Sequence, residues 1–201
     1  MQVLYEDGAL IVCIKPAGVL SQEAPGKANM VDLLREKTGS EIFPVHRLDR
    51  EVGGVMVFAK TQKAAASLSR QIAEHTFEKV YVARVHGVPA PEKGEMEDLL
   101  FKDSAKNKVF VVRRERRGVK KAKLAYEVLS VDENGNALVK IRLFTGRTHQ
   151  IRVQFASRKH PLLGDGKYGA RDGEAKLQLW SKEIAFDHPE TGERMEWKIE
   201  N

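Results

Sequence analysis

The chain has 201 residues, and 42% of them are hydrophobic, which is enough for one core without disulfide or metal support. Its 34 lysines and arginines outnumber 28 acidic residues, giving a formal charge of +6 and a pI near 9.4. This balance favours a polyanionic partner, and nucleic acid is the first candidate. The single cysteine excludes a disulfide framework and a thiolate metal site.

Targeting and membrane signals are absent from the sequence. The N-terminus has no basic segment followed by a long apolar run, and no run approaches the roughly 18 residues of a membrane span. Cys13 lies in an apolar run and is predicted to be a buried hydrophobe. We expect a soluble, cytoplasmic monomer with no membrane association, no obligate protein partner and one domain over residues 1–201.

The first third of the chain predicts strands and helices in alternation. Residues 3–5 and 10–14 are two strands of a hairpin, because the turn sequence Glu6-Asp7-Gly8 separates them. An amphipathic helix is predicted from Met30 to Lys37, with Gly39 as its stop. Residues 55–59 form a short apolar run typical of a buried strand, and Thr61 can cap a helix that runs to about Glu74.

The remainder of the chain is predicted to be mostly strands. Residues 77–87 alternate as a strand, and 109–112 form another inside a basic tract. The dipeptide Asn134-Gly135 predicts a hairpin joining strands 124–131 and 136–144. A helix is favoured from about Thr148, although the apolar periodicity there is also compatible with a strand. Residues 177–186 and 195–199 predict a closing hairpin.

The stretch from Pro44 to Gly54 concentrates the reactive side chains. Asp49 is adjacent to Arg50 and two residues from Arg47. Guanidinium groups favour the ionised acid, so the Asp49 carboxylate is predicted to be available as a nucleophile or base on a loop that enters a buried strand. The alternative is a surface cluster of ion pairs without catalytic function.

Three blocks of sequence resemble the RluA-type pseudouridine synthases. The first, His46-Arg47-Leu48-Asp49-Arg50-Glu51 followed by glycine and a strand ending in Phe-Ala-Lys, resembles the active-site signature of that family. The second is Lys79-x-Tyr81-x-Ala83-x-Val85-x-Gly87, and the third runs from Leu143 to Arg152. The opening strand before Lys15-Pro16-Ala17-Gly18 is also similar, which leaves no room for the small S4-like RNA-binding module that precedes it in longer relatives.

The resemblance implies an α+β fold, a single domain built on a largely antiparallel mixed β-sheet with flanking helices. It also implies that uridine in RNA is isomerised to pseudouridine. By this likeness Asp49 acts at the ribose, either attacking C1′ or taking a proton from C2′, and Arg147 is its ion-pair partner. Tyr81 would stack on the target base. Neither a cofactor nor a metal is implied, because the isomerisation is redox neutral.

The expected partner is structured RNA, either ribosomal or transfer RNA. Residues 102–123 carry ten basic side chains against Asp103 and Glu115, so this tract is predicted to meet phosphates and to set affinity and salt dependence; a merely solvated face is the alternative. Arg47 is predicted either to fill the gap left by the flipped nucleotide or to contact a phosphate. The predicted RNA contacts are His46, Arg47, Arg50, Lys79, Arg113, Arg114, Arg116, Arg117, Lys120, Lys121, Thr148, His149 and Gln150.

Two adjacent positions depart from the family pattern. The family shows Thr-Ser-Gly after the Asp-Arg-Glu run, and this chain has Val52-Gly53-Gly54. The departure puts the conformation of the loop and the choice of substrate in doubt more than the reaction. Two other functions remain as alternatives: a non-catalytic RNA- or ribosome-binding module, and an RNA hydrolase that uses Asp49 with His46 or His149.

Overall fold

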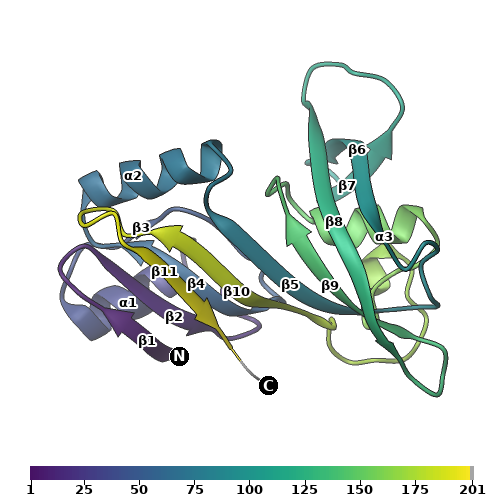
Figure 1. The fold of residues 1–201 in the computed structure, drawn as a ribbon, viewed down its shortest axis with the longest axis horizontal. Coiled ribbons are helices and arrows are strands. Elements are labelled where there is room, and N and C mark those ends of the chain that lie inside the picture. Colours follow the sequence, from purple (N-terminus) through teal and green to yellow (C-terminus); the bar gives the residue numbers. More distant parts are fainter. Residues whose placement is uncertain (200–201) are drawn as a thin grey trace. The chain divides into compact units, whose positions relative to one another are not determined.

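The computed structural model describes residues 1–199, which form two compact units (Figure 1). Unit 1 contains residues 1–79 and the C-terminal segment from residue 180, whereas unit 2 is the continuous segment 80–179. Unit 1 is therefore assembled from both ends of the chain. None of the helices in residues 1–199 is long and apolar enough to cross a membrane. The single domain predicted over residues 1–201 stays a prediction.

Unit 1 is built on a mixed, mostly antiparallel sheet. Its strands run in the order β1-β2-β4-β10, with β11 paired to β10 and β3 paired to β4. Only the pairing of β4 with β10 is parallel among these. The predicted opening and closing hairpins are confirmed as β1–β2 and β10–β11. The strands are β1 (Gln2–Glu6), β2 (Leu10–Lys15), β3 (Phe43–Pro44), β4 (Gly53–Ala59), β10 (Leu179–Asp187) and β11 (Arg194–Lys198).

The two helices of unit 1 begin at side-chain caps that the sequence indicates. Helix α1 (Met30–Thr38) begins after Asn29, whose side chain accepts the backbone N–H of Asp32, and ends at Gly39 with φ +67°. Helix α2 (Gln62–Ala73) begins after Thr61, whose hydroxyl accepts the N–H of Ala64 at 3.1 Å. Both predicted helices are confirmed to within a residue or two.

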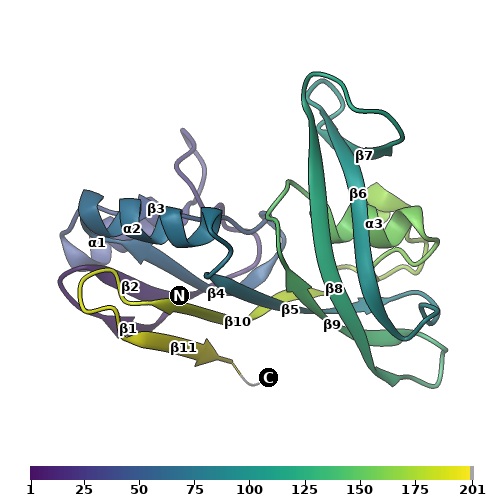
Figure 2. The same ribbon diagram turned by 45° about the horizontal axis from the view of Figure 1, so that its top comes forward.

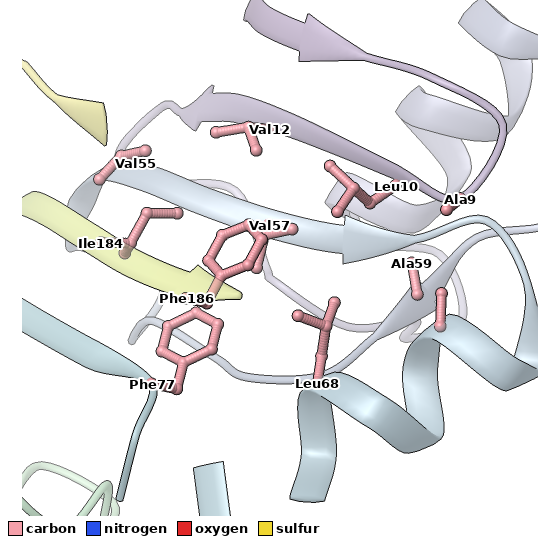
Figure 3. Close-up of a cluster of buried hydrophobic side chains, with 11 residues drawn as sticks. Ala9, Leu10, Val12, Val55, Val57, Ala59, Leu68, Phe77, Ile184 and Phe186 are labelled. Atoms are coloured by element: carbon pink, nitrogen blue, oxygen red, sulfur yellow. The ribbon is translucent and has the colours of Figure 1, made fainter. Parts of the chain in front are cut away.

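The core of unit 1 surrounds β4, all of whose residues are buried. One face of β4 packs under α2 through Leu68, and Phe186 of β10 stacks on Phe77 with the ring centroids 5.2 Å apart (Figure 3). A strand buried on both faces is a rigid support, so the loop entering it has a fixed end. The buried members of this cluster are Ala9, Leu10, Val12, Val55, Val57, Ala59, Ala64, Leu68, Phe77, Ile184 and Phe186.

Unit 2 is an antiparallel sheet covered on one face by helix α3 (Gln150–Ser157). Figures 1 and 2 both draw α3 behind β6 and β8, and Val153 packs there against Leu100, Val109 and Ala122. A 3₁₀ turn, η1 (Gly166–Tyr168), adds Tyr168 to this cluster. The strand order is β5-β9-β8-β6-β7, with β5 (Glu78–Val85), β6 (Lys93–Asp103), β7 (Lys108–Val112), β8 (Val119–Val131) and β9 (Ala137–Leu143).

Unit 2 confirms most of the expected elements and adds one. The hairpin between β8 and β9 turns at Asn134-Gly135, where Gly135 has φ +75°. Helix α3 is confirmed, although it begins at Gln150 with His149 as its N-cap residue, two positions later than expected. Strand β6 was not predicted, because charged residues interrupt its apolar alternation.

Candidate active site

Asp49 lies on an irregular loop, residues 45–52, between β3 and β4. Asp49 is half-buried, and its backbone carbonyl accepts the N–H of Val52 at 3.0 Å, which closes a tight turn directly before the buried strand. The predicted position of Asp49 on a loop that enters the sheet is therefore confirmed.

A buried serine holds the residue immediately before Asp49. The hydroxyl of Ser21, which is 3% exposed, donates to the carbonyl of Leu48 at 2.9 Å and accepts the N–H of Leu48 at 2.9 Å. One hydroxyl thus satisfies both backbone groups of a residue 27 positions away in sequence. This reciprocal pair fixes the loop on the N-terminal side of Asp49.

A buried lysine holds the residue immediately after Asp49. Lys15 is 0% exposed, and its ammonium donates to the carbonyls of Pro16 at 2.9 Å, Val19 at 2.6 Å and Arg50 at 3.1 Å. Burial lowers the pKa of this ammonium to about 8, while the nearby charges of Glu51 and Asp49 act in the opposite direction. Lys15 therefore places a satisfied positive charge beneath the loop that carries Asp49.

Gly18 adds two further bonds to the same loop. Its N–H donates to the carbonyl of Arg50 at 2.8 Å, and its own carbonyl accepts from the Arg50 guanidinium Nε at 3.0 Å. The same Nε lies 3.8 Å from a carboxylate oxygen of Glu51. Segment 15–21, which we call the cradle, therefore binds the loop on both sides of Asp49. Sequence reasoning missed this function, although the Lys-Pro-Ala-Gly motif was visible as the end of a strand.

His46 anchors the start of the Asp49 loop to β4. Its ring Nε2 accepts the N–H of Val57 at 3.2 Å, so in the neutral ring Nδ1 carries the proton. Nδ1 is buried and has no hydrogen-bond partner among the described residues. Burial, helped by the nearby charge of Lys79, lowers the pKa of His46 to about 3. The imidazole is therefore neutral at physiological pH, and its predicted contact with RNA stays a prediction.

Gly54 is the one position of the Val52-Gly53-Gly54 run that agrees with the family pattern. It has φ +125°, and a Cβ built there would lie 2.1 Å from the carbonyl oxygen of Ser181 on the paired strand β10. A Cβ on Gly53 would instead meet the carbonyl oxygen of Lys15 at 3.3 Å, with no unusual φ. Glycine is required by the backbone at position 54, whereas at position 53 the backbone conformation does not demand it.

Arg147 lies on the loop that joins β9 to α3 in unit 2. Gln150, which is 3% exposed, accepts the Arg147 N–H at 3.0 Å and the Thr145 hydroxyl at 2.8 Å, and donates to the carbonyl of Lys123 at 3.1 Å. The Arg147 guanidinium Nε donates to the carbonyl of Lys121 at 2.9 Å. Hydrogen bonds therefore hold both the backbone N–H and the guanidinium Nε of Arg147.

A buried network sets the orientation of His149. The Tyr168 hydroxyl accepts the N–H of Val109 at 2.9 Å and lies within hydrogen-bonding distance of His149 Nδ1, at 2.8 Å. Below Tyr168, Arg152 binds Asp165 through two 2.7 Å bonds. His149 holds φ +50°, an uncommon conformation for a residue other than glycine, which this network stabilises.

The remaining predicted residues of the site differ in exposure. Tyr81 is 5% exposed on β5 and pairs with Ile141 of β9. Lys79 is 6% exposed, and burial lowers its pKa. The observed contacts of Lys79 and Gln150 are internal, and their RNA contacts stay predictions. Arg47 is exposed, as are the tract residues Arg113, Arg114, Arg116, Arg117, Lys120 and Lys121, and Thr148 is half-buried.

Asp49 belongs to unit 1, whereas Tyr81 and Arg147 belong to unit 2. The predicted ion pair between Asp49 and Arg147, and the placement of Tyr81 against the target base, stay predictions. Among residues 1–199 no group of three or more His, Cys, Asp or Glu side chains is placed to hold a metal ion.

Comparison with known proteins shows the family to which the chain belongs. A family model described as RNA pseudouridylate synthase matches residues 9–157. A dual-specificity RNA pseudouridine synthase RluA from Yersinia pestis is 38% identical over 208 residues, covering 100% of this chain and 98% of the relative. The RluA of Escherichia coli K12 is 35% identical, covering 98% of this chain and 91% of its own length.

The solved structures agree in fold. The human RNA pseudouridylate synthase domain containing 4 protein superposes with a TM-score of 0.79 at 24% identity, covering 99% of this chain and 88% of that protein. An RNA-modifying isomerase is therefore the class that the fold and the sequence blocks define. The chain belongs to the RNA pseudouridylate synthase family and is of the RluA type.

Proposed function

We propose that the chain isomerises uridine to pseudouridine in ribosomal or transfer RNA, with Asp49 as the reacting carboxylate, Arg147 as its partner and Tyr81 against the target base. Similar proteins are named a dual-specificity RNA pseudouridine synthase RluA and, from Buchnera aphidicola, a ribosomal large subunit pseudouridine synthase C. The latter is 34% identical, and this chain covers 65% of its length. The proposal includes a cytoplasmic monomer that needs no protein partner.

The reaction breaks the bond between C1′ and N1, turns the uracil, and forms a bond between C1′ and C5 before a proton leaves C5. The Asp49 carboxylate would either attack C1′ or remove a proton from C2′. A guanidinium suits the partner function, because it stays charged and can bind a carboxylate through two bonds. An aromatic ring such as that of Tyr81 gives the detached base a face on which to turn.

The observation that supports this assignment is the cradle. Four of its bonds reach the backbone of Leu48 and Arg50, the two neighbours of Asp49, and so hold the backbone on both sides of Asp49. A reacting group held this way loses little freedom on binding substrate, which favours a productive geometry.

Incubation of the purified chain with RNA from a strain lacking its gene tests the function. New pseudouridine, mapped by carbodiimide adducts in separated ribosomal and transfer RNA fractions, is the expected result. Absence of new adducts in every fraction, with RNA binding retained, would support the non-catalytic binding module instead.

The basic tract is expected to determine how salt affects RNA binding. Each phosphate contact contributes about 0.7 to 0.9 to the slope of log affinity against log salt, so Arg113→Glu with Arg114→Glu should reduce the slope by about 1.4 to 1.8. Filter binding between about 50 and about 300 mM salt measures this slope. Lys37→Glu with Lys63→Glu, the same charge change on exposed residues of α1 and α2, is the matched control. An unchanged slope in the tract variant would mean that the tract is a solvated face that makes no phosphate contacts.

Lys15 is expected to make activity and stability respond oppositely to alkaline pH. Its pKa is lowered from 10.5 to about 8, so between these values the unfolded chain binds a proton that the folded chain has lost, and this group makes the free energy of unfolding rise with pH. Loss of the ammonium charge beneath Asp49 should meanwhile reduce single-turnover pseudouridine formation above about pH 8. Rates and urea unfolding measured at the same pH values check both. A rate that is constant to pH 10 (about two units above the Lys15 pKa) would show that the charge is not needed.

A further inference from the structure

An exposed aromatic ring lies within the basic tract of unit 2. Phe110 is 37% exposed in the middle of β7, the strand at the edge of the sheet, and lies directly opposite Phe101 of β6. Its neighbour Val109 is 3% exposed and packs in the cluster beneath α3. Because successive side chains of a strand point to opposite faces, Phe110 lies on the face of the sheet that α3 does not cover (Figure 2).

The two rings of this cross-strand pair differ in what covers them. The Arg116 guanidinium lies 4.5 Å from the centroid of the Phe101 ring, and a Cβ on Gly118 would lie 3.6 Å from that ring. The cations over the Phe110 ring belong to long, flexible side chains, with the ammonium of Lys106 at 6.0 Å and that of Lys108 at 5.9 Å from the ring centroid. Phe110 is therefore the more accessible aromatic surface of the pair.

The charges around Phe110 determine which ligand would suit it. Lys106 lies in the turn that leads into β7, and Lys108 is the first residue of that strand, inside a tract with a strong excess of cations. An aromatic ring between cations matches a single-stranded nucleic acid, in which a base stacks on the ring and adjacent phosphates meet the cations. A cation over an exposed ring contributes roughly 2- to 5-fold in affinity, whereas a stacked base contributes roughly 5- to 150-fold, so a base can displace the lysines from the ring.

We propose that Phe110 is a stacking platform for an unpaired RNA base away from the nucleotide that reacts, with Lys106 and Lys108 binding the phosphates beside that base. The inference rests on the proposed RNA function and adds a second contact to it. The platform selects unpaired RNA rather than a particular sequence, since every base has a face that can stack.

The test compares two ligands of equal charge, a uridine hexamer and a hexamer of abasic ribose phosphate, for the full chain and three variants. Phe110→Leu keeps an apolar side chain but has no ring, whereas Phe110→Trp keeps a stacking surface. Leu129→Ala, on an exposed apolar residue of β8 in the same unit, is the matched control. Fluorescence anisotropy gives the ratio of the two affinities, and tryptophan quenching in Phe110→Trp, measured relative to the wild type with its Trp180 and Trp197, reports stacking at position 110.

We expect Phe110→Leu to reduce the ratio by roughly 5- to 150-fold while leaving the affinity for the abasic strand unchanged. Phe110→Trp and Leu129→Ala should keep the ratio, and the indole of Phe110→Trp should be quenched by the uridine strand alone. A Phe110→Leu ratio equal to that of the wild type would overturn the platform and leave Phe110 as a cross-strand partner of Phe101. If the wild type binds neither strand and forms no pseudouridine, the proposed function itself fails; if it forms pseudouridine and only the ratio is insensitive, the platform alone fails.

Discussion

Asp49→Asn is expected to bind RNA as the wild type does and to form pseudouridine more slowly by a factor on the order of 10⁴ or more. The amide has the shape of the carboxylate but can neither attack C1′ nor take a proton from C2′. The loop should keep its position, because the cradle holds backbone groups of Leu48 and Arg50. Single-turnover assays on ribosomal and transfer RNA, combined with filter binding, separate the two effects.

Glu41→Gln is the matched control for Asp49→Asn. It removes one negative charge from an exposed residue of the same unit, outside the loop, so its rate should stay within about twofold of wild type. A rate for Asp49→Asn that equals the control would remove Asp49 from the chemistry. A loss of RNA affinity that matches the loss of rate would mean that the carboxylate acts in binding.

Gly54→Ala is expected to have the largest effect on stability. The new Cβ would lie 2.1 Å from the carbonyl oxygen of Ser181, and alanine is disfavoured at φ +125°. We expect a loss of about 3 kcal/mol or more in the free energy of unfolding, and a melting temperature lower by about 6 to 12 °C, or failure to fold. Thermal unfolding followed by circular dichroism measures the shift.

Gly53→Ser is the contrasting change, since it restores the residue that the family pattern has at this position. Its Cβ would meet the carbonyl oxygen of Lys15 at 3.3 Å, a contact that a shift of a few tenths of an ångström relieves. We expect a change in stability within about 1 kcal/mol and retained activity. Equal losses in Gly53→Ser and Gly54→Ala would show that crowding at this turn, and not the backbone conformation of position 54, controls stability.

The hairpins and helices could be predicted because their signals are local. Glu6-Asp7-Gly8 and Asn134-Gly135 specify turns by themselves, and Thr61 begins α2 and Gly39 ends α1 through bonds within four residues. Strand β6 could not be predicted this way, because Asp98 occupies a position on the face that packs against α3. That carboxylate is accommodated by bonds from Gln154 at 2.7 Å and Arg158 at 2.8 Å, both more than 50 residues away.

In the candidate site, too, the local features could be predicted from the sequence and the long-range contacts could not. The positions of Asp49 and Arg147 on loops at the ends of strands followed from motif and periodicity. The cradle did not, since a lysine at the end of a strand reads as a polar stop, and the burial of Lys15 depends on a carbonyl 35 residues away in sequence. Likewise, the sequence marks His46 as a polar residue in a basic stretch, but only the pairing of its loop with β4 makes it an internal acceptor.

The discontinuity of unit 1 has a consequence for synthesis on the ribosome. Unit 2 is complete once residue 179 has emerged, whereas unit 1 lacks β10 and β11 until residues 180–198 have followed. Until then the apolar side chains of β4 that later pack against Ile184 and Phe186 have no cover, and such surfaces favour aggregation. Unit 1, which carries the proposed reacting carboxylate of Asp49, is thus completed after unit 2, so a nascent chain released before β10 would hold the proposed RNA-binding tract without a complete unit 1.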